Sequence, residues 1–428
     1  MSTADTNIQA INCTACGATL DVLGGHRVRS LTCGYCGSVM DRHAGFQVVE
    51  RHQNKPDRPY APIALGMQST LKGVPFTVIG MIQYVSHQSG PGWAESYDWI
   101  SFQLFSPTHG YAWLTWNKGH YLFSYRTRDL PEPVVPKSLN QKDRVRLGER
   151  TFRMFERYAA EVAYVEGELT WIARRGDKTH EVEAIDPPYL FSYEQSDDEL
   201  EYSIGDYLDA DEVHAAFGIE PAERPEGIHP AQPFRPSGLV KALAKVGPIF
   251  AGVAILGLFA VSVLGSGREI VQSRIDDPSS TTWTVPFTVA DAGRLLKIEL
   301  SSDVQNNWVY YDIDVNDAKT DAWVLSLGQE LSFYEGRDSD GRWTEGSKQA
   351  EALFKLPTAG DYEIEITASE AGGTIPPLGI RLYDGILVKR YFVVLLILSV
   401  LAALALPVMQ KNFEKRRWDD VLEDDDDD

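Results

Sequence analysis

The stretch VGPIFAGVAILGLFAVSVL at Val246–Leu264 decides how this chain is organised, because it holds nineteen residues without a charged side chain. A second stretch of equal length and purity, YFVVLLILSVLAALALPVM, lies at Tyr391–Met409. As helices rising about 1.5 Å per residue, both would measure about 28 Å, close to the hydrocarbon thickness of a bilayer. A buried core helix is the alternative, but core helices seldom run this long without polar residues. The sequence therefore predicts two transmembrane helices, at 240–264 and 391–409.

The residues that flank the two stretches predict an orientation. Basic residues gather at the outer ends, with Arg224, Arg235, Lys241 and Lys245 before the first stretch and Lys411, Lys415, Arg416 and Arg417 after the second. The inner ends also carry Arg268, Arg274, Lys389 and Arg390, so the positive-inside rule favours two cytoplasmic termini without deciding the matter. Residues 1–10 show no secretory signal. We expect a two-pass protein of the bacterial cytoplasmic (inner) membrane, with residues 268–388 outside it.

The two stretches carry no ionisable side chain, whereas ion pathways and proton relays place such groups inside the membrane. A pore or pump is therefore disfavoured, and the stretches are interpreted as anchors. Small residues on the first, namely Gly252, Ala254, Gly257 and Ala260, would let another helix approach closely.

The charge balance limits the partners. The chain has 61 Asp and Glu residues against 40 Lys and Arg, a formal net charge of -21. Binding to nucleic acid needs a basic face that neutralises phosphates, so a nucleic-acid partner is not expected. The 428 residues are too many for one hydrophobic core, which predicts several folded units.

Four cysteines near the N-terminus form two pairs, Cys13 and Cys16, then Cys33 and Cys36, each followed by glycine. Two residues between cysteines let a tight turn aim both thiolates at one ion, and four such ligands close a tetrahedral site. We predict a structural Zn²⁺ in a zinc ribbon over residues 8–45, with Thr19–Thr32 as a hairpin that joins the pairs. Two disulfides or four free thiols are the alternatives.

Residues 60–220 contain alternating, aromatic-rich runs separated by turn residues, which predicts an antiparallel β domain in the cytoplasm. A weak internal echo relates Leu65-Gly66 and the following PFTVIGMIQYV to Leu147-Gly148 and the following FRMFERYAAEVAYV. Two related half-barrels or sheets are therefore expected. A helix at 209–217, capped by Asp209 or Asp211, would end the domain, and a Pro-rich linker at 221–238 would lead to the membrane.

Several segments resemble a known bacterial family. They are VPFTVIGMIQYV, YAWLTWNKGHYLFSYR, VAYVEGELTW at Val162–Trp171 and ELEYSIGDYL at Glu199–Leu208, with SFYEGRDSDGRWTEGS at Ser332–Ser347. The family is the domain of unknown function numbered four-one-seven-eight, which includes membrane-anchored members with an N-terminal zinc ribbon. The resemblance implies no catalytic residues. More loosely, it implies a genomic association with coat proteins similar to phage-shock protein A.

Two other arrangements in the β domain are candidates for function. His87, His109 and His120, with Glu95 and Asp98, are a conceivable acid–base set, but no nucleophile or phosphate-binding motif accompanies them. Trp93, Trp99, Trp113 and Trp116 suit either a peptide-binding groove or the core of a β fold. Structural roles are the simpler interpretation of both sets.

Between the two apolar stretches, seven or eight short alternating segments predict a β-sandwich over residues 268–388. Its LPTAGDYEIEITA segment is similar to late strands of jelly-roll modules that bind carbohydrate. Asp338, Asp340 and Glu345 offer the hard oxygen ligands that Ca²⁺ needs, although ordinary hairpin turns have the same composition.

The predicted fold is thus mainly β and multidomain, with a basic then acidic cytoplasmic tail at 410–428. Residues 411–417 would lie against anionic headgroups, and Asp424–Asp428 would either meet a basic partner or remain solvated. The expected function is a non-enzymatic scaffold or sensor that recruits protein partners to the membrane, with envelope stress as a candidate setting. The alternatives are an enzyme with a His- and aromatic-lined site in the β domain, or an extracytoplasmic glycan or calcium receptor.

Overall fold

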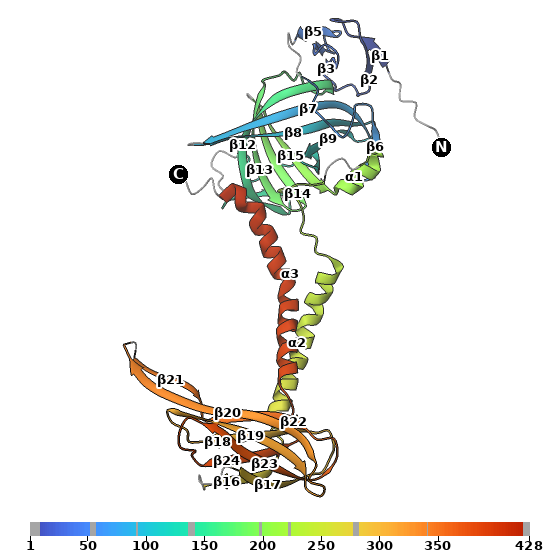
Figure 1. The fold of residues 1–428 in the computed structure, drawn as a ribbon. Coiled ribbons are helices and arrows are strands. Elements are labelled where there is room, and N and C mark those ends of the chain that lie inside the picture. The colour runs from blue at the N-terminus through green and yellow to red at the C-terminus, as the bar shows by residue number, and fades with distance from the viewer. Residues whose placement is uncertain are drawn as a thin grey trace, which may run out of the picture. The chain divides into compact units, whose positions relative to one another are not determined.

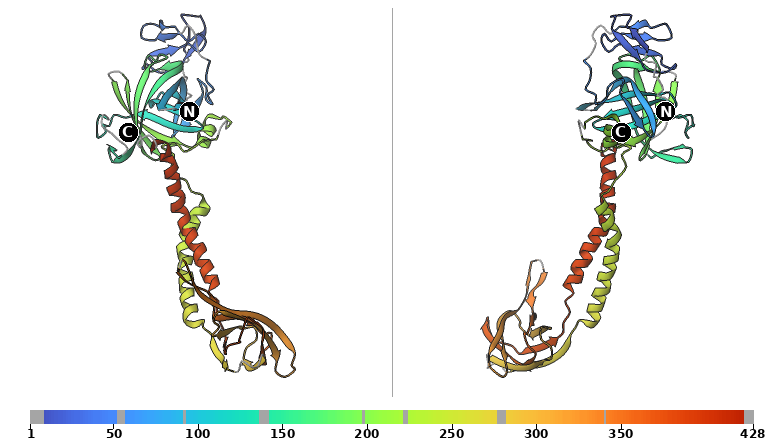
Figure 2. Two further views of the ribbon diagram at one scale, coloured as in Figure 1. Left: turned by 60° about the vertical axis from the view of Figure 1, so that its left-hand side comes forward. Right: turned by 90° about the vertical axis from the view of Figure 1, so that its right-hand side faces the viewer.

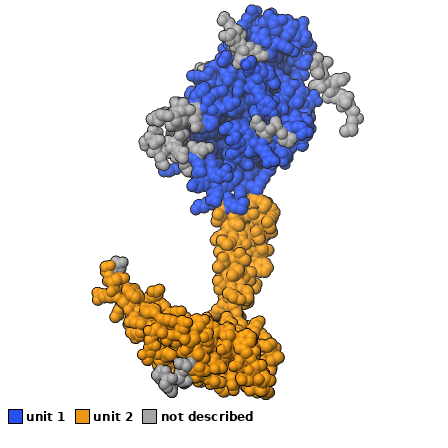
Figure 3. Space-filling model, in the orientation of Figure 1, with its two compact units in different colours: residues 1–235, 409–428 blue, residues 236–408 orange. Residues whose placement is uncertain are grey.

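The computed structural model describes residues 9–51, 57–90, 93–135, 142–196, 199–220, 224–276, 282–339 and 341–422. Asp340, the start of the predicted linker at 221–223 and the acidic tail Asp424–Asp428 lie outside the described residues. The chain forms two compact units, residues 1–235 with 409–428 and residues 236–408 (Figure 3). Each unit has its own β core, as expected for a chain of this length.

A closed barrel is the centre of the first unit (Figures 1 and 2). Its eight strands are β7 (Val74–Gly90), β8 (Trp93–Ser106), β9 (Gly110–Asn117), β10 (His120–Arg126), β12 (Arg150–Leu169), β13 (Lys178–Asp186), β14 (Tyr189–Ser196) and β15 (Glu199–Leu208). β7 to β10 form one antiparallel meander and β12 to β15 another. Pairing of β10 with β15 and of β7 with β12 closes the ring. The predicted half-barrels therefore form a single barrel.

The internal echo corresponds to a repeated hairpin. β6 (Gln68–Leu71) pairs with the start of β7, and β11 (Arg144–Leu147) pairs with the start of β12. Gly73 and Gly148, with φ of 79° and 59°, occupy the matching turns. Glycine tolerates this left-handed backbone at little cost. By register Leu71 corresponds to Leu147, so the structural counterpart of Gly148 is Lys72, with φ of 51°, rather than Gly66.

β7 and β12 cross at two glycines that face each other in register, Gly80 and Gly167. A Cβ on Gly167 would lie 2.4 Å from the Ile79 carbonyl oxygen, and one on Gly80 would lie 2.3 Å from the Glu168 carbonyl oxygen. No side chain fits between these backbones. Glycine at both positions therefore permits the barrel to close here.

The N-terminal module contains β1 (Gln9–Asn12), β2 (Thr19–Val22), β3 (Ser30–Thr32), β4 (Val39–Asp41) and β5 (Gln47–Glu50), so it extends five residues beyond the predicted end at 45. β1 pairs with β2, whereas β3 pairs with β4 and also with the end of β12. The predicted hairpin at Thr19–Thr32 is wrong, because its two halves belong to different sheets. The second sheet continues into the barrel wall.

Helix α1 (Ala210–Phe217) follows β15 and packs on the barrel. The Asp209 side chain caps it by accepting a hydrogen bond from the Asp211 amide, which confirms the first of the two predicted caps. Val213 is fully buried in the apolar cluster that the helix shares with β7, β8 and β9. The helix thus closes one side of the barrel core.

The second unit contains a β-sandwich. Its strands are β16 (Arg268–Ile275), β17 (Thr282–Val289), β18 (Leu295–Ser302), β19 (Asn307–Asp317), β20 (Trp323–Asp338), β21 (Gly341–Ser347), β22 (Gln349–Lys355), β23 (Gly360–Ala371) and β24 (Leu378–Asp384). One sheet has the order β16-β24-β18-β22 and the other β17-β23-β19-β20-β21. Alternate residues of both sheets, such as Ile298 and Ile313, fill one shared core.

Two helices are long and apolar enough to cross a membrane, α2 (Gly238–Leu264) and α3 (Arg390–Leu422). Gly247 of α2 lies against the backbone of Ser399 and Ala403, and Gly257 lies against the Phe392 ring. Of the small residues predicted to meet a helix, Ala254 is fully buried and Gly257 is in contact, whereas Gly252 faces open space and Ala260 is exposed. α3 continues thirteen residues beyond the predicted end at Met409.

Candidate functional site

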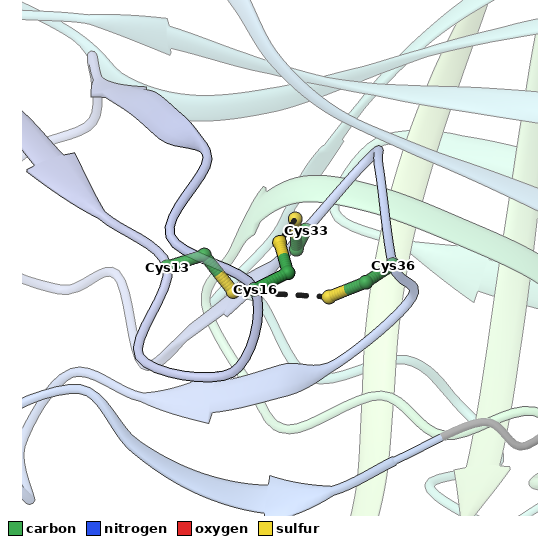
Figure 4. A group of neighbouring side chains, drawn as sticks. All are labelled: Cys13, Cys16, Cys33 and Cys36. Carbon is green, nitrogen blue, oxygen red and sulfur yellow. Dashed lines mark hydrogen bonds between the residues drawn. The ribbon is translucent and has the colours of Figure 1, made fainter.

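The two cysteine pairs occupy matching turns. The amides of Gly17 and Gly37 donate to the Cys13 and Cys33 carbonyls, both at 2.8 Å, and both glycines have positive φ. Each turn therefore directs two thiols to the same side, as Figure 4 shows. The four sulfur atoms all lie within 4.8 Å of one another, so the cluster could hold a metal ion.

The sulfur distances fit a tetrahedral site. Sγ of Cys13 lies 3.8 Å from that of Cys36, and Sγ of Cys16 lies 3.8 Å from that of Cys33. A zinc–sulfur bond of about 2.3 Å in a regular tetrahedron places sulfur atoms about 3.8 Å apart. The free thiols are not positioned as disulfides, since bonded sulfurs lie only about 2 Å apart.

The cysteines differ in their surroundings. Burial raises the pKa of the Cys33 thiol to about 12. Burial also acts on Cys36, but hydrogen bonds from Ser38 outweigh it and lower the pKa to about 6. A bound cation would favour the thiolate at all four positions.

A buried carboxylate joins the cysteine module to the barrel. Glu168 of β12 is 1% exposed and accepts hydrogen bonds from the amides of Leu23 and Gly24. Arg42 lies 3.9 Å from its other oxygen. Burial raises the pKa of Glu168, and the two amides and Arg42 oppose that rise. These bonds, with the β3–β12 ladder, fix the module against the barrel wall.

The barrel encloses a cavity of about 1870 Å³. Carboxylates from neighbouring strands line it, with Glu181 of β13 opposite Glu194 of β14, which is in turn opposite Glu201 of β15. The Tyr158 hydroxyl lies 2.9 Å from Glu181 Oε2 and 2.8 Å from Glu183 Oε1. Burial raises the pKa of Glu183 to about 7, and burial together with Glu194 and Glu183 raises that of Glu181.

The end of α3 is part of the same unit as the barrel. Trp418 is 7% exposed and packs on Phe155, with ring centroids 5.0 Å apart, while the Arg153 guanidinium lies 3.8 Å from its ring centroid. Arg417 is 3% exposed and donates to the carbonyls of Pro230 and Gln232. The expectation that Arg417 lies on headgroups is therefore wrong, because its guanidinium is buried and donates to backbone carbonyls.

The segment at 224–235 is not a free linker. The Glu226 amide donates to the Lys118 carbonyl, and the Glu226 carbonyl lies 2.9 Å from His120 Nε2. Burial lowers the pKa of His229, which lies beside His120, to about 3. The segment thus lies along the barrel before α2 begins.

The described members of the candidate acid–base set do not come together. His120 is bonded to Tyr207 and the Glu226 carbonyl, His109 to Thr108, and Asp98 to Gln83. His87 is exposed, and the side chain of Glu95 lies outside the described residues. His120, His109 and Asp98 are thus each hydrogen-bonded to residues outside the candidate set.

The tryptophans divide between two environments. Trp99 and Trp113 line the barrel cavity, whereas Trp116 packs in the cluster shared with α1 and against Tyr60. The Trp93 side chain lies outside the described residues. The three described tryptophans do not form one peptide-binding groove, but Trp99 and Trp113 contribute to the wall of the barrel cavity.

The predicted calcium ligands lie on the β20–β21 hairpin. Asp338 pairs with Gly341, and Glu345 pairs with Tyr334, four residue pairs further along. At about 3.4 Å per residue, this places their Cα atoms about 14 Å apart. The carboxylates of Asp338 and Glu345 thus do not converge on one site. Asp340 lies outside the described residues, so the Ca²⁺ site remains a prediction.

A comparison with protein families decides how the barrel is classified. Residues 64–210 match the family described as Domain of unknown function (DUF4178). The barrel is a DUF4178 domain. The matched residues run from just before β6 to the start of α1, so they include both meanders and exclude the cysteine module, both long helices and the sandwich.

Other comparisons add nothing about the fold beyond the DUF4178 domain. No curated protein matches the chain significantly. Among solved structures, the exo-beta-1,3-galactanase of Phanerochaete chrysosporium with galactose is 9% identical, with a TM-score of 0.17 over 88% of this chain and 100% of that one. The structure of infectious bursal disease virus Gx strain is 8% identical, with a TM-score of 0.14 over 84% and 75%.

Sequence reasoning missed the groups that line the DUF4178 barrel and the residues that bind α3 to it. Glu181 and Glu183 alternate with Val182 and Ala184, a pattern typical of a strand with one exposed face. The signal that could have found Trp418 is a lone aromatic residue directly after a basic run, where headgroup binding was expected.

Trp418→Ala is expected to destabilise the attachment of α3 to the DUF4178 domain by about 3 kcal/mol, because a buried indole is lost. Hydrogen exchange of the full-length protein in nanodiscs should become faster at residues 224–235 and 410–422. Lys415→Ala, an exposed change in the same helix, should leave exchange unchanged. Equal exchange in both variants would contradict a structural role for Trp418.

Proposed function

We propose that this chain is a non-enzymatic, two-pass scaffold or sensor that holds a DUF4178 barrel and a zinc ribbon at the cytoplasmic face of the bacterial inner membrane. The docking of α3 carries the proposal: one continuous helix contains an apolar stretch and ends with Trp418 and Arg417 buried on the barrel. A helix of this kind tethers the barrel far more closely than a flexible linker would.

The other modules support a role in recruitment. The four cysteines close the coordination sphere of a Zn²⁺ ion, which leaves no open position for catalysis and suits a structural ion. A rigid ribbon fixed to the barrel by Glu168 presents a small surface for a protein partner. The partner proposed is a membrane coat protein similar to phage-shock protein A, as the family resemblance implies. The sandwich would lie outside the membrane.

Labelling of intact cells tests the orientation. Thr344→Cys, on the exposed face of β21, should react with a membrane-impermeant maleimide, whereas the four native cysteines should react only after permeabilisation and chelation. Proximity labelling from an N-terminal biotin ligase should then mark a coat protein in the intact chain and lose it when Cys33 is changed to serine. Protection of the introduced thiol in intact cells, or partner labelling that does not depend on the ribbon, would refute the proposal.

A further inference from the structure

The interior of the barrel differs from that of a typical small barrel. An eight-stranded barrel has room for packed side chains or for one small ligand. Here Val182 and Ala184 point away from the cavity into a separate apolar cluster under β11, while Glu181 and Glu183 on the same strand line the cavity. The polar face of β13 is therefore turned towards the cavity. A barrel interior that served only for packing would be lined by apolar side chains instead.

Carboxylates follow one another along this wall, while basic side chains such as Arg126 and Arg157 line other parts of the cavity. Glu194 is directly opposite both Glu181 and Glu201 in the ladders, and like charges opposite each other destabilise a sheet. Arg126 of β10 forms an ion pair with Glu201 and lies at that end of the row. Glu181 and Glu183 lie at the other end, where both are within hydrogen-bond distance of the Tyr158 hydroxyl.

The two carboxylates beside Tyr158 need one more hydrogen-bond donor than the phenol supplies. The phenol has a single O–H, yet it lies within hydrogen-bond distance of two carboxylates. With both carboxylates ionised, one of them faces a phenol lone pair. The arrangement is satisfied by an added proton or by an N–H donor that carries positive charge.

A second observation points to a ligand. Tyr84 is 9% exposed and Ser86 is 4% exposed, and both line the cavity from β7. Within the described part of the chain, neither hydroxyl has a side-chain hydrogen bond, so both are available to a molecule in the cavity. Their oxygens face the same space as the carboxylates. The wall between them is aromatic, since the Trp99 ring stacks on Tyr84 and meets Tyr158 edge-on, both at 5.6 Å.

We propose that the barrel cavity binds an organic cation, an ammonium or guanidinium group carried on an apolar body. The carboxylates of Glu181 and Glu183 accept its N–H donors, Tyr84 and Ser86 supply further polar contacts, and the Trp99 ring packs on the cation or its apolar body. A bare metal ion fits less well, because among the described residues only the four cysteines converge closely enough to ligate one.

The titration of the wall agrees with this chemistry. Burial raises the pKa of Glu183 to about 7, and a cation bound beside this carboxylate would lower that pKa because it favours the ionised form. Glu181 and Glu183 are both partly buried, and both line the cavity.

Binding by the full-length protein in nanodiscs tests the proposal with two matched probe pairs that differ in charge: N-acetylargininamide against N-acetylcitrullinamide, and benzylamine against benzyl alcohol. Calorimetry against empty nanodiscs, together with tryptophan fluorescence, should show saturable binding of the cation in at least one pair. The neutral partner should bind at least tenfold more weakly. Absence of saturable cation binding, or equal affinity within both pairs, would overturn the proposal.

Variants locate the site. Glu181→Gln with Glu183→Gln should weaken cation binding at least tenfold, while Glu212→Gln, on the exposed face of α1, should leave it unchanged. Tyr84→Phe removes a hydroxyl with no side-chain partner and keeps the aromatic ring, so it should fold normally and weaken binding several-fold. Unchanged affinity in a folded glutamine double variant, or in Tyr84→Phe, would refute this placement of the ligand.

Discussion

Cys33→Ser is expected to release the metal and unfold the N-terminal module. Cys33 is fully buried, and its amide bonds to the Ser38 carbonyl inside the second knuckle. Structural zinc contributes about 10–16 kcal/mol to zinc-finger peptides, more than a module of this size gains from its small apolar core. Metal content of the purified protein should fall, and residues 9–50 should become sensitive to protease.

The consequences should extend into the barrel. When the module unfolds, Glu168 loses the Leu23 and Gly24 amides, and β12 loses its β3 partner. A buried carboxylate without donors is costly, so exchange at residues 165–169 should also become faster. Tyr35→Ser, at a 74%-exposed position of the same knuckle, is the matched control. Full metal content with unchanged protease resistance in Cys33→Ser would show that the cysteines do not hold a structural ion.

Gly167→Ala is expected to destabilise the barrel by about 3 kcal/mol or more. The position has φ of 78°, which costs a residue with a side chain about 1–2 kcal/mol, and the new methyl group would meet the Ile79 carbonyl oxygen at 2.4 Å. The β7–β12 crossing would have to separate. Local unfolding measured by hydrogen exchange at residues 78–84 and 162–169 should increase accordingly.

Gly148→Ala is the matched control for this change. Its φ of 59° has the same sign, but no heavy atom lies within 4 Å of the added Cβ, so only the backbone cost of about 1 kcal/mol applies. The difference between the two variants measures the steric closure of the barrel. Equal destabilisation would mean that β7 and β12 do not approach each other as closely as the structure has them.

The sequence was informative wherever the signal is local. Paired cysteines with following glycines predict the knuckles, and alternating runs predict the strands, because turn geometry and side-chain alternation act over a few residues. The echo between the segments after Gly66 and Gly148 even indicated two related halves. It could not indicate closure, because the β7–β12 and β10–β15 pairings join segments that are far apart in the sequence.

Two expectations were wrong or incomplete because they rested on the type of side chain alone, without its neighbours in the fold. The basic run ending at Arg417 suggested lipid headgroups, since the sequence does not show that the Pro230 and Gln232 carbonyls are within reach. In β13, alternation places charged residues on one face, and the usual rule puts that face in solvent. In a closed barrel the inward face can be the charged one, so Glu181 and Glu183 were not recognised as lining a cavity.

Arg417 belongs both to α3 and to the lining of the barrel cavity. A turn or a lift of this helix would carry the guanidinium with it and reshape the cavity floor. Conversely, an occupant of the cavity would press on this end of α3. Occupancy of the cavity and the seating of the helix end on the barrel would therefore each alter the other.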